Sequence, residues 1–184
     1  LKAIKRIKEL DLTMKPHLDY ARDIFLFSFY TRGMSFIDMA YLKKSDLKNG
    51  TITYRRRKTG QQLTVKWEKC MEDIIAKYGE NTATRYLLPI ITNPCSDERT
   101  QYRNAICRIN VALKEVAGLA GLNIPLTMHV ARHCWASVAK SKNIPLSVIS
   151  EGMGHDSEET TRIYLASLDT SVVDKANSLI LKDF

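Results

Sequence analysis

Four side chains near the C-terminal end of the sequence have types and spacings that suit chemistry. His129 and Arg132 are three positions apart in a segment with helical patterning, so their side chains share one face of a helix. His155 follows Gly154 at a predicted tight turn, and Tyr164 comes nine positions later. Nine positions correspond to about 900° of helical rotation, which is half a turn out of phase. His155 should therefore project from the turn that precedes the helix of Tyr164.

A second group of charged side chains lies in a predicted β-hairpin. Arg56, Arg57 and Lys58 are consecutive and precede the turn residue Gly60. Because neighbouring side chains of a strand point to opposite faces, we expect Arg56 and Lys58 on one face and Arg57 on the other. The hairpin thus predicts that one arginine and one lysine reach the same site.

Together these residue types suit phosphoryl transfer. The Tyr164 oxygen can attack a phosphate and form a covalent phosphotyrosine. Guanidinium groups match the non-bridging phosphate oxygens, where negative charge builds up in the transition state. A lysine or histidine can protonate the departing sugar oxygen. No metal ion is required if the protein supplies enough fixed cations.

Each of these residues also has an ordinary structural interpretation. His129 and His133 are four positions apart and could form half of a zinc site, but the glutamate of an H-E-x-x-H motif is missing and no third ligand is evident. Tyr164 is one of eight tyrosines, and Lys58 beside Gly60 could serve the turn alone. Taken singly, each residue favours the ordinary interpretation. Their order and spacing together favour an active site.

The elements that must position these residues are mostly helices. Residue patterns predict one hairpin, 51–57 paired with 63–67, and helical periodicity elsewhere. The segments 35–38 and 156–159 look like capping boxes that begin two of the helices. The predicted helices cover 17–30, 35–42, 67–78, 96–121, 127–142, 145–152, a segment from 156 that carries Tyr164, and 171–181. The predicted fold class is α+β, mainly α-helical with a small antiparallel β-sheet.

Composition narrows the class of protein. The 184 residues suit one globular domain, and 45% of them are hydrophobic, which is enough for a sizeable core. Of the net charge of +8, +7 lies between Lys43 and Lys69, where nine Lys and Arg stand against two Asp and Glu. Such a block favours a polyanionic partner, nucleic acid first and a membrane surface second, although a solvated charged face has the same composition.

The cysteines and the apolar runs exclude several classes. The four cysteines form no C-x-x-C pair, so they indicate neither a zinc ribbon nor a disulfide framework, and reduced thiols in a cytosol are expected. They are Cys70, Cys95, Cys107 and Cys134. No apolar run approaches the length needed to span a bilayer, and the sequence shows no signal peptide, so we expect no membrane partner.

Three segments resemble the motifs of the tyrosine recombinases, also called phage-type integrases. The segment 127–136, Thr-Met-His-Val-Ala-Arg-His-Cys-Trp-Ala, resembles their H-x-x-R-H box. The segment 152–164, Gly-Met-Gly-His-Asp-Ser-Glu-Glu-Thr-Thr-Arg-Ile-Tyr, is similar to their L-G-H-S-x-x-x-T-T-x-x-Y motif, and 54–60 resembles their lysine hairpin. The amino-acid sequence of segment 25–42 resembles that of mobile-element integrases and invertases of Bacteroides-like bacteria.

The resemblance implies a site-specific DNA recombinase or integrase. Tyr164 would attack a DNA phosphate and leave a 3′-phosphotyrosine and a free 5′-hydroxyl, and the 5′-end of a partner duplex would then attack that linkage. Lys58 would be the general acid and Arg132 would hold the phosphate. His129 would assist proton transfer, and His155 would hydrogen-bond the phosphate. No high-energy cofactor would be needed, because the covalent intermediate keeps the phosphodiester energy.

The sequence departs from the family pattern at the first catalytic arginine. With the family motif aligned on Asp38, that arginine falls on Ser35. Arg56 and Arg32 are the two candidates to replace it, and a weakened site is the third alternative. We favour Arg56, because strand alternation should direct it where Lys58 points, whereas a neighbouring glycine leaves the direction of Arg32 less determined.

The resemblance also implies partners and domain organisation. Residues 1–14 would be a linker or remnant from a core-binding domain, and 15–184 would be the catalytic domain. The partner would be double-stranded DNA, on which four protomers assemble over two duplexes, with the C-terminal segment, here 172–181, on a neighbour and with accessory DNA-bending proteins. The expected location is the bacterial cytoplasm, at the nucleoid. The expected DNA contacts are Lys43, Lys44, Arg55, Arg57 and Arg162.

Two other activities share some of these features. A type IB topoisomerase uses the same chemistry but reseals its own strand. A catalytically dead DNA-binding module would need only the basic hairpin, and the retained histidines, Arg132 and Tyr164 argue against it.

Overall fold

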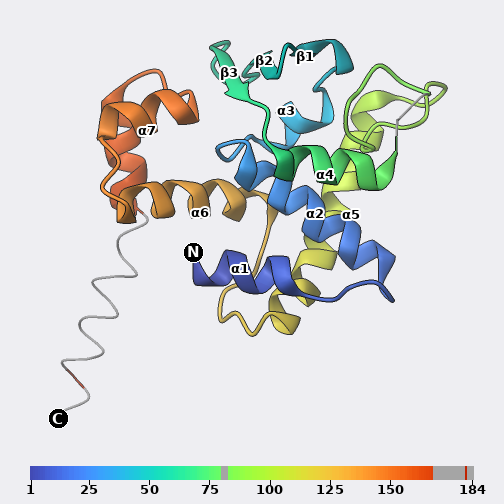
Figure 1. The fold of residues 1–184 in the computed structure, drawn as a ribbon, viewed down its shortest axis with the longest axis horizontal. Coiled ribbons are helices and arrows are strands. Elements are labelled where there is room, and N and C mark those ends of the chain that lie inside the picture. Colours follow the sequence, from blue (N-terminus) through green and yellow to red (C-terminus); the bar gives the residue numbers. More distant parts are fainter. Residues whose placement is uncertain (80–82, 168–180, 182–184) are drawn as a thin grey trace.

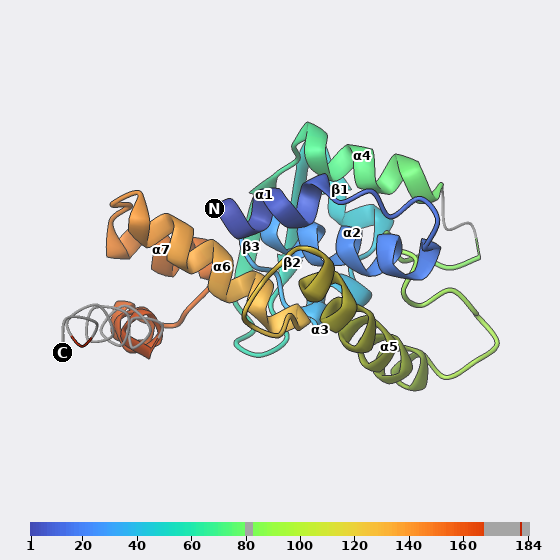
Figure 2. The same ribbon diagram turned by 90° about the horizontal axis from the view of Figure 1, so that it is seen from below.

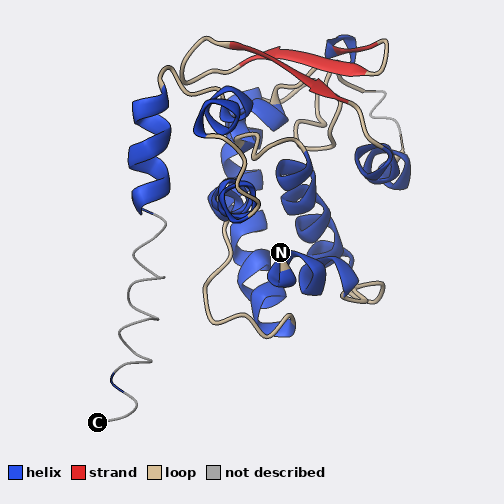
Figure 3. Cartoon of the chain, turned by 60° about the vertical axis from the view of Figure 1, so that its left-hand side comes forward, coloured by secondary structure: helices blue, strands red, loops and turns tan. Residues whose placement is uncertain are grey.

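The structure, a computed structural model, describes residues 1–79, 83–167 and 181. A group of helices lies beneath a small sheet, and α7 lies to one side with the helical segment that follows it (Figure 1, Figure 3). The helices are α1 (Lys2–Glu9), α2 (Pro16–Tyr30), α3 (Phe36–Ala40), the 3-10 helix η1 (Lys44–Asp46), α4 (Lys69–Tyr78), α5 (Glu98–Leu119), α6 (Met128–Ser141), α7 (Leu146–Met153) and the 158–167 helix. The strands are β1 (Leu47–Lys48), β2 (Thr51–Arg55) and β3 (Gln62–Lys66). The predicted fold class is confirmed.

The central helix is α2. Apolar side chains surround most of it, and Leu18, Ile24, Phe25 and Phe27 are fully buried. A helix of this composition must be covered on all sides. Accordingly, α1, α4, α5 and α6 pack around it (Figure 2). α6, the helix of His129 and Arg132, is thereby fixed against the centre of the main core.

The sheet is an antiparallel meander in the order β1-β2-β3. Ile52 of β2 is paired with Val65 of β3, and both side chains are buried in the main core. Thr53 and Thr64 are paired one position along and point away from that core. One face of the sheet therefore covers the helices, as the alternation of apolar and polar residues predicts.

The hairpin turn is longer than expected. The prediction that the first strand reaches residue 57 is wrong, because β2 ends at Arg55. The Arg56 N–H donates to the carbonyl of Gln61 at 2.8 Å, and the Gly60 N–H donates to the carbonyl of Arg56 at 2.7 Å. These bonds close a turn, so the strand alternation expected for Arg56 and Lys58 does not apply.

A small core, separate from the main one, joins the C-terminal half of α6 to α7 and the 158–167 helix. Its buried members are Ala136, Ala139, Ile149, Met153 and Leu165. Trp135 and Tyr164 pack against this small core, whereas Met128 and Ala131 at the start of α6 belong to the main core. α6 thus takes part in both cores.

The first residues of the chain include α1, which packs on the main core, and the assignment of 1–14 as a linker or remnant stays a prediction. Within 1–14, Ile4, Ile7 and Leu12 are buried in the main core. Arg22 of α2 donates hydrogen bonds of 2.9 to 3.3 Å to three carbonyl groups at the end of α1. A packed helix therefore occupies most of this stretch. The core-binding domain that the resemblance implies stays a prediction.

Both predicted capping boxes differ in detail. Ser35 is the N-cap residue of α3 but makes no side-chain cap hydrogen bond. Asp38, the expected partner in that box, is buried and accepts a hydrogen bond of 3.0 Å from the Arg57 N–H. In the second box, the Ser157 hydroxyl accepts a hydrogen bond from the Thr160 N–H at 3.2 Å, so this helix begins one residue later than expected. The Asp38 carboxyl group thus binds the backbone of the hairpin turn and does not cap its own helix.

The other predicted helices are confirmed, with small shifts at their ends. The predicted last helix, 171–181, lies outside the described residues except for Leu181. Within the described part of the chain, no helix is both long enough and apolar enough to cross a membrane.

Candidate active site

A cavity of about 450 Å³ lies among the hairpin turn, the start of α6, the turn after α7 and the 158–167 helix. These four segments are far apart in the sequence, and each contributes side chains to the cavity wall. Six side chains proposed from the sequence line it: Arg56, Lys58, His129, Arg132, His155 and Tyr164. The structure therefore brings the sequence candidates together in one place.

Arg132 is fixed between two distant parts of the chain. Its Nη1 donates to the carbonyl of Gly33 at 3.0 Å and its Nη2 donates to the carbonyl of Met153 at 2.8 Å. Gly33 has φ +73°, and a Cβ atom there would lie 2.7 Å from Cα of Arg132. Burial, and then the neighbouring Arg56, lower the pKa of Arg132 to about 10, so its guanidinium stays charged at neutral pH.

Arg56 brings a second guanidinium into the same cavity. The residue is only 6% exposed, and its Nη1 donates to the carbonyl of Gly154 at 2.9 Å. Its Nε has no hydrogen-bond partner among the described residues. Two buried positive charges repel each other unless an anion lies between them. The charge of Arg56 accordingly lowers the pKa of Arg132. The pair therefore favours binding of an anionic ligand.

The hairpin turn directs Arg56 and Lys58 to the cavity and Arg57 away from it. Lys58 is exposed and lines the cavity. The Arg57 N–H is held by Asp38, and its guanidinium carbon lies 3.8 Å from the centre of the Tyr41 ring. Arg56 and Lys58 thus lie on one side and Arg57 on the other, as expected. The conformation of the turn produces this arrangement, and strand alternation does not.

His155 projects from the turn after α7, as expected. Gly154 ends α7 in the left-handed conformation, with φ +67°, and a Cβ atom there would lie 2.8 Å from the side chain of Leu63. The Nδ1 atom of His155 lies 2.6 Å from Oγ1 of Thr161. Burial, followed by nearby Arg132, lowers the pKa of His155 to about 4, so the ring is neutral at pH 7.

Tyr164 contacts a histidine that the sequence argument did not include as a site residue. Its hydroxyl oxygen lies 2.6 Å from Nδ1 of His133, and the two rings stack with centroids 5.3 Å apart. The ring edge also meets His155 at 5.6 Å. Burial raises the pKa of Tyr164 to about 12. The available signal was the spacing of His129 and His133, which puts both on one face of α6.

His129 lies at the exposed side of the same group. Its ring is perpendicular to that of His133, with centroids 4.4 Å apart. Partial burial of the ring, followed by Arg132 and Lys58, lowers the pKa of His129. Among the described residues, the hydrogen bond of the Tyr164 hydroxyl is to His133, and His129 has no such bond.

The sequence matches the model of the phage integrase family over residues 4–171, a range that contains every residue of this cavity. The chain belongs to the phage integrase family. A comparison with curated protein sequences found no match.

Solved structures of recombinases share the fold of this family member. XerA recombinase has a TM-score of 0.62 at 20% identity, over 92% of this chain and 62% of that chain. XerH recombinase, in a post-cleavage complex with palindromic difH substrate, has a TM-score of 0.66 at 19% identity, over 95% and 50%. The lambda integrase catalytic core has a TM-score of 0.54 at 16% identity, over 84% and 90%. The chain thus spans 62% of XerA and half of XerH.

Ser35, Arg32 and Arg56, the three positions that bear on the family's first arginine, lie in different surroundings. Ser35, which aligns with it, begins α3. Arg32 has φ +62°, and its Cδ lies 3.6 Å from where a Cβ of Gly152 would be. Arg32 is half-buried and is not among the residues that line the cavity, whereas Arg56 is.

The residues expected to contact DNA lie mainly on the hairpin side of this integrase domain. Arg55 and Arg57 are exposed and, with Lys43, line a second hollow of about 200 Å³. Arg162 is exposed on the 158–167 helix and pairs with Glu159 at 3.0 Å. The remaining candidate, Lys44, is half-buried in η1.

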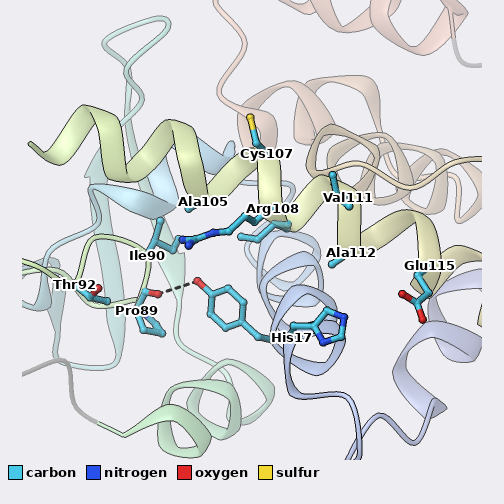
Figure 4. A pocket seen from close by; sticks show the side chains of 12 residues that line it. His17, Pro89, Ile90, Thr92, Ala105, Cys107, Arg108, Val111, Ala112 and Glu115 are labelled. Carbon is cyan, nitrogen blue, oxygen red and sulfur yellow. Dashed lines mark hydrogen bonds between the residues drawn. The ribbon is translucent and has the colours of Figure 1, made fainter.

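A larger cavity, about 700 Å³, lies between α2, α5 and the segment around Pro89 (Figure 4). The hydroxyl of Tyr20 donates to the Pro89 carbonyl at its edge, at 2.8 Å. None of the six clustered candidates lines it, so size does not identify the reactive site here. Within the described residues, no group of three or more His, Cys, Asp or Glu could hold a metal ion.

Proposed function

We propose that this chain is the catalytic domain of a site-specific DNA recombinase or integrase that acts through a covalent 3′-phosphotyrosine. The observation that carries the proposal is the meeting of two buried guanidinium groups, Arg132 and Arg56, with Tyr164 in one cavity. A phosphodiester is an anion with an electrophilic centre. Fixed cations beside a phenol therefore suit both its binding and its attack.

In the cleavage step the oxygen of Tyr164 attacks the phosphorus, and the bond from phosphorus to the 5′-oxygen breaks. Lys58 donates a proton to the departing 5′-oxygen. Arg132 holds the non-bridging oxygens, where charge develops. His155 donates a hydrogen bond to the phosphate, and His129 assists proton transfer. In the second step the 5′-hydroxyl of a partner duplex attacks the phosphotyrosine and releases Tyr164, so no cofactor enters the balance.

Arg56 takes the part of the family's first arginine in this proposal. Three observations support it: the side chain is buried, it lines the cavity, and its Nε lacks a partner among the described residues. Arg32 has no comparable support, because its side chain lies against α7 near Gly152. A guanidinium supplied from the hairpin would act on the phosphate with the same chemistry as one supplied from residue 35.

Double-stranded DNA is the proposed partner. The basic hairpin supports it, as do relatives in the fold whose structures hold DNA, such as XerH with its difH substrate and a lambda integrase dimer with a COC′ core site. Lys43, Lys44, Arg55, Arg57 and Arg162 would contact the phosphates. We further propose assembly of four protomers on two duplexes through 172–181, with accessory DNA-bending proteins, at the nucleoid of a bacterial cytoplasm.

The test is covalent capture of the protein on a nicked suicide duplex. We expect the wild-type chain to form an adduct that survives a denaturing gel, and Tyr164→Phe to form none while binding DNA with near wild-type affinity. Tyr102→Phe makes the same chemical change on a ring that stacks on Phe36 outside the cavity, and should form the adduct normally. Undiminished adduct in Tyr164→Phe would move the nucleophile elsewhere, and no adduct in the wild type would refute the activity.

A further inference from the structure

The contact between Tyr164 and His133 has the geometry of a nucleophile and its base. The hydroxyl oxygen and Nδ1 are 2.6 Å apart, which is a short hydrogen-bond distance. The rings are nearly parallel, with an interplanar angle of 18°. Stacking therefore holds the ring of His133 in the orientation that the hydrogen bond needs.

The other histidines of the cavity are less suited to take the phenol proton. Nδ1 of His155 is occupied by Thr161, and its ring meets Tyr164 edge-on. His129 is exposed, and its described ring contact is with His133. His133 is thus the histidine whose nitrogen reaches the reacting oxygen.

We propose that His133 is the catalytic base for Tyr164. This inference rests on the proposed function. In the tautomer with its proton on Nε2, Nδ1 of His133 accepts the phenol proton as Tyr164 Oη bonds to phosphorus. The 5′-oxygen leaves with a proton from Lys58, so one proton is taken up and one is released. On resealing, His133 returns its proton to the departing phenolate.

The charges around this pair match the task. Burial, and then His129 and Arg132, lower the pKa of His133, so the ring is neutral and able to accept a proton at neutral pH. A phosphate bound between the guanidinium groups offsets their charge and makes a protonated His133 less unfavourable. The base should therefore be strongest when substrate is in place. The titratable and charged groups facing the pair are His129, Arg132 and Cys134 on α6, His155 on the turn after α7, and Arg56 on the hairpin.

The first test is single-turnover cleavage of the suicide duplex at saturating DNA, measured against pH. The pKa of His133 is lowered, so wild-type cleavage should slow only at a pH more acidic than an ordinary histidine would require, where His133 becomes protonated. His133→Asn keeps an acceptor near Nδ1 but no base. This variant should cleave at least about a hundredfold more slowly than wild type. Its rate should also lack the acidic limb, which is the fall in cleavage rate at low pH. His129→Asn is the matched control on the same helix face, and it should retain the limb whatever its rate.

The second test separates a base from a residue that only positions the ring. Fluorotyrosine at position 164 has a more acidic phenol, so it needs a base less. The defect of His133→Asn should shrink on this nucleophile, whereas a lost positioning contact would cost the same on both. A constant defect, a wild-type rate in His133→Asn, or loss of the limb in His129→Asn would each overturn the inference. All three outcomes require adduct formation by the wild type, so they leave the proposed function standing.

Discussion

Replacing Arg56 by alanine tests whether the hairpin supplies the missing arginine. The guanidinium is buried, donates to the Gly154 carbonyl and lies close enough to Arg132 to lower its pKa. A fixed cation held at a buried position stabilises developing charge strongly, and loss of one donor typically costs about 2.7–4 kcal/mol. We therefore expect Arg56→Ala to slow cleavage at saturating DNA about a hundredfold or more.

Folding should be affected less than the rate. Arg56→Ala leaves the Gly154 carbonyl without this donor, but it also removes a buried charge that opposes Arg132. The two effects have opposite signs, so thermal unfolding should stay close to wild type. The pKa of Arg132 should rise toward its ordinary value.

Two further variants make the assay decisive. Arg55→Ala removes an exposed arginine from the same hairpin, and should weaken binding and lower its salt slope by about one unit, with little change in cleavage at saturation. Arg32→Ala should also leave the cleavage rate near wild type. The reasoning is refuted if Arg32→Ala shows the large rate defect and Arg56→Ala only the salt effect. If neither variant is slow, the site works with one arginine fewer.

Three other predictions concern the acid, the metal and the backbone. Lys58→Ala should cleave ordinary DNA slowly but recover on a 5′-phosphorothiolate substrate, because sulfur leaves without a proton; equal slowness on both would make Lys58 a binding residue. Cleavage should continue in a metal chelator, and its loss with DNA binding intact would contradict a site that relies on fixed cations. Gly33→Ala should lower stability by more than the roughly 1–2 kcal/mol of left-handed strain, because its Cβ would meet Arg132 at 2.7 Å. Gly121→Ala, with φ +66° and open space around it, is the control for strain alone in thermal unfolding.

The helices were predictable because their apolar periodicity is strong. α2 lies within one residue of its predicted start, and the hairpin was found from its β-branched residues and Gly60. The end of β2 was not predictable in the same way. It is set by the backbone hydrogen bonds between Arg56 and residues 60 and 61, and these depend on how the turn closes.

The errors at the site arise from contacts between distant segments. Asp38 has the spacing of a capping box, but the hairpin reaches it with a backbone N–H that competes for the carboxylate. The sequence indicates His133 only as a possible zinc ligand, because the pattern it forms with His129, four positions earlier, is that of half a zinc site. Its actual partner, Tyr164, is 31 positions away and is brought near by the packing of the small core. Spacing along one helix cannot reveal such a contact.

The small core carries a consequence for how Tyr164, the proposed nucleophile, can be controlled. Among the described residues it has five buried members, whereas Arg132, the guanidinium that we propose holds the phosphate, is also tied to Gly33 beside the main core. A region with fewer buried apolar contacts opens at a lower free energy than the whole domain. Amide hydrogens of α7 and the 158–167 helix should accordingly exchange with solvent faster than those of α2. The phenol can then be withdrawn and restored by local opening, while the rest of the domain keeps its fold.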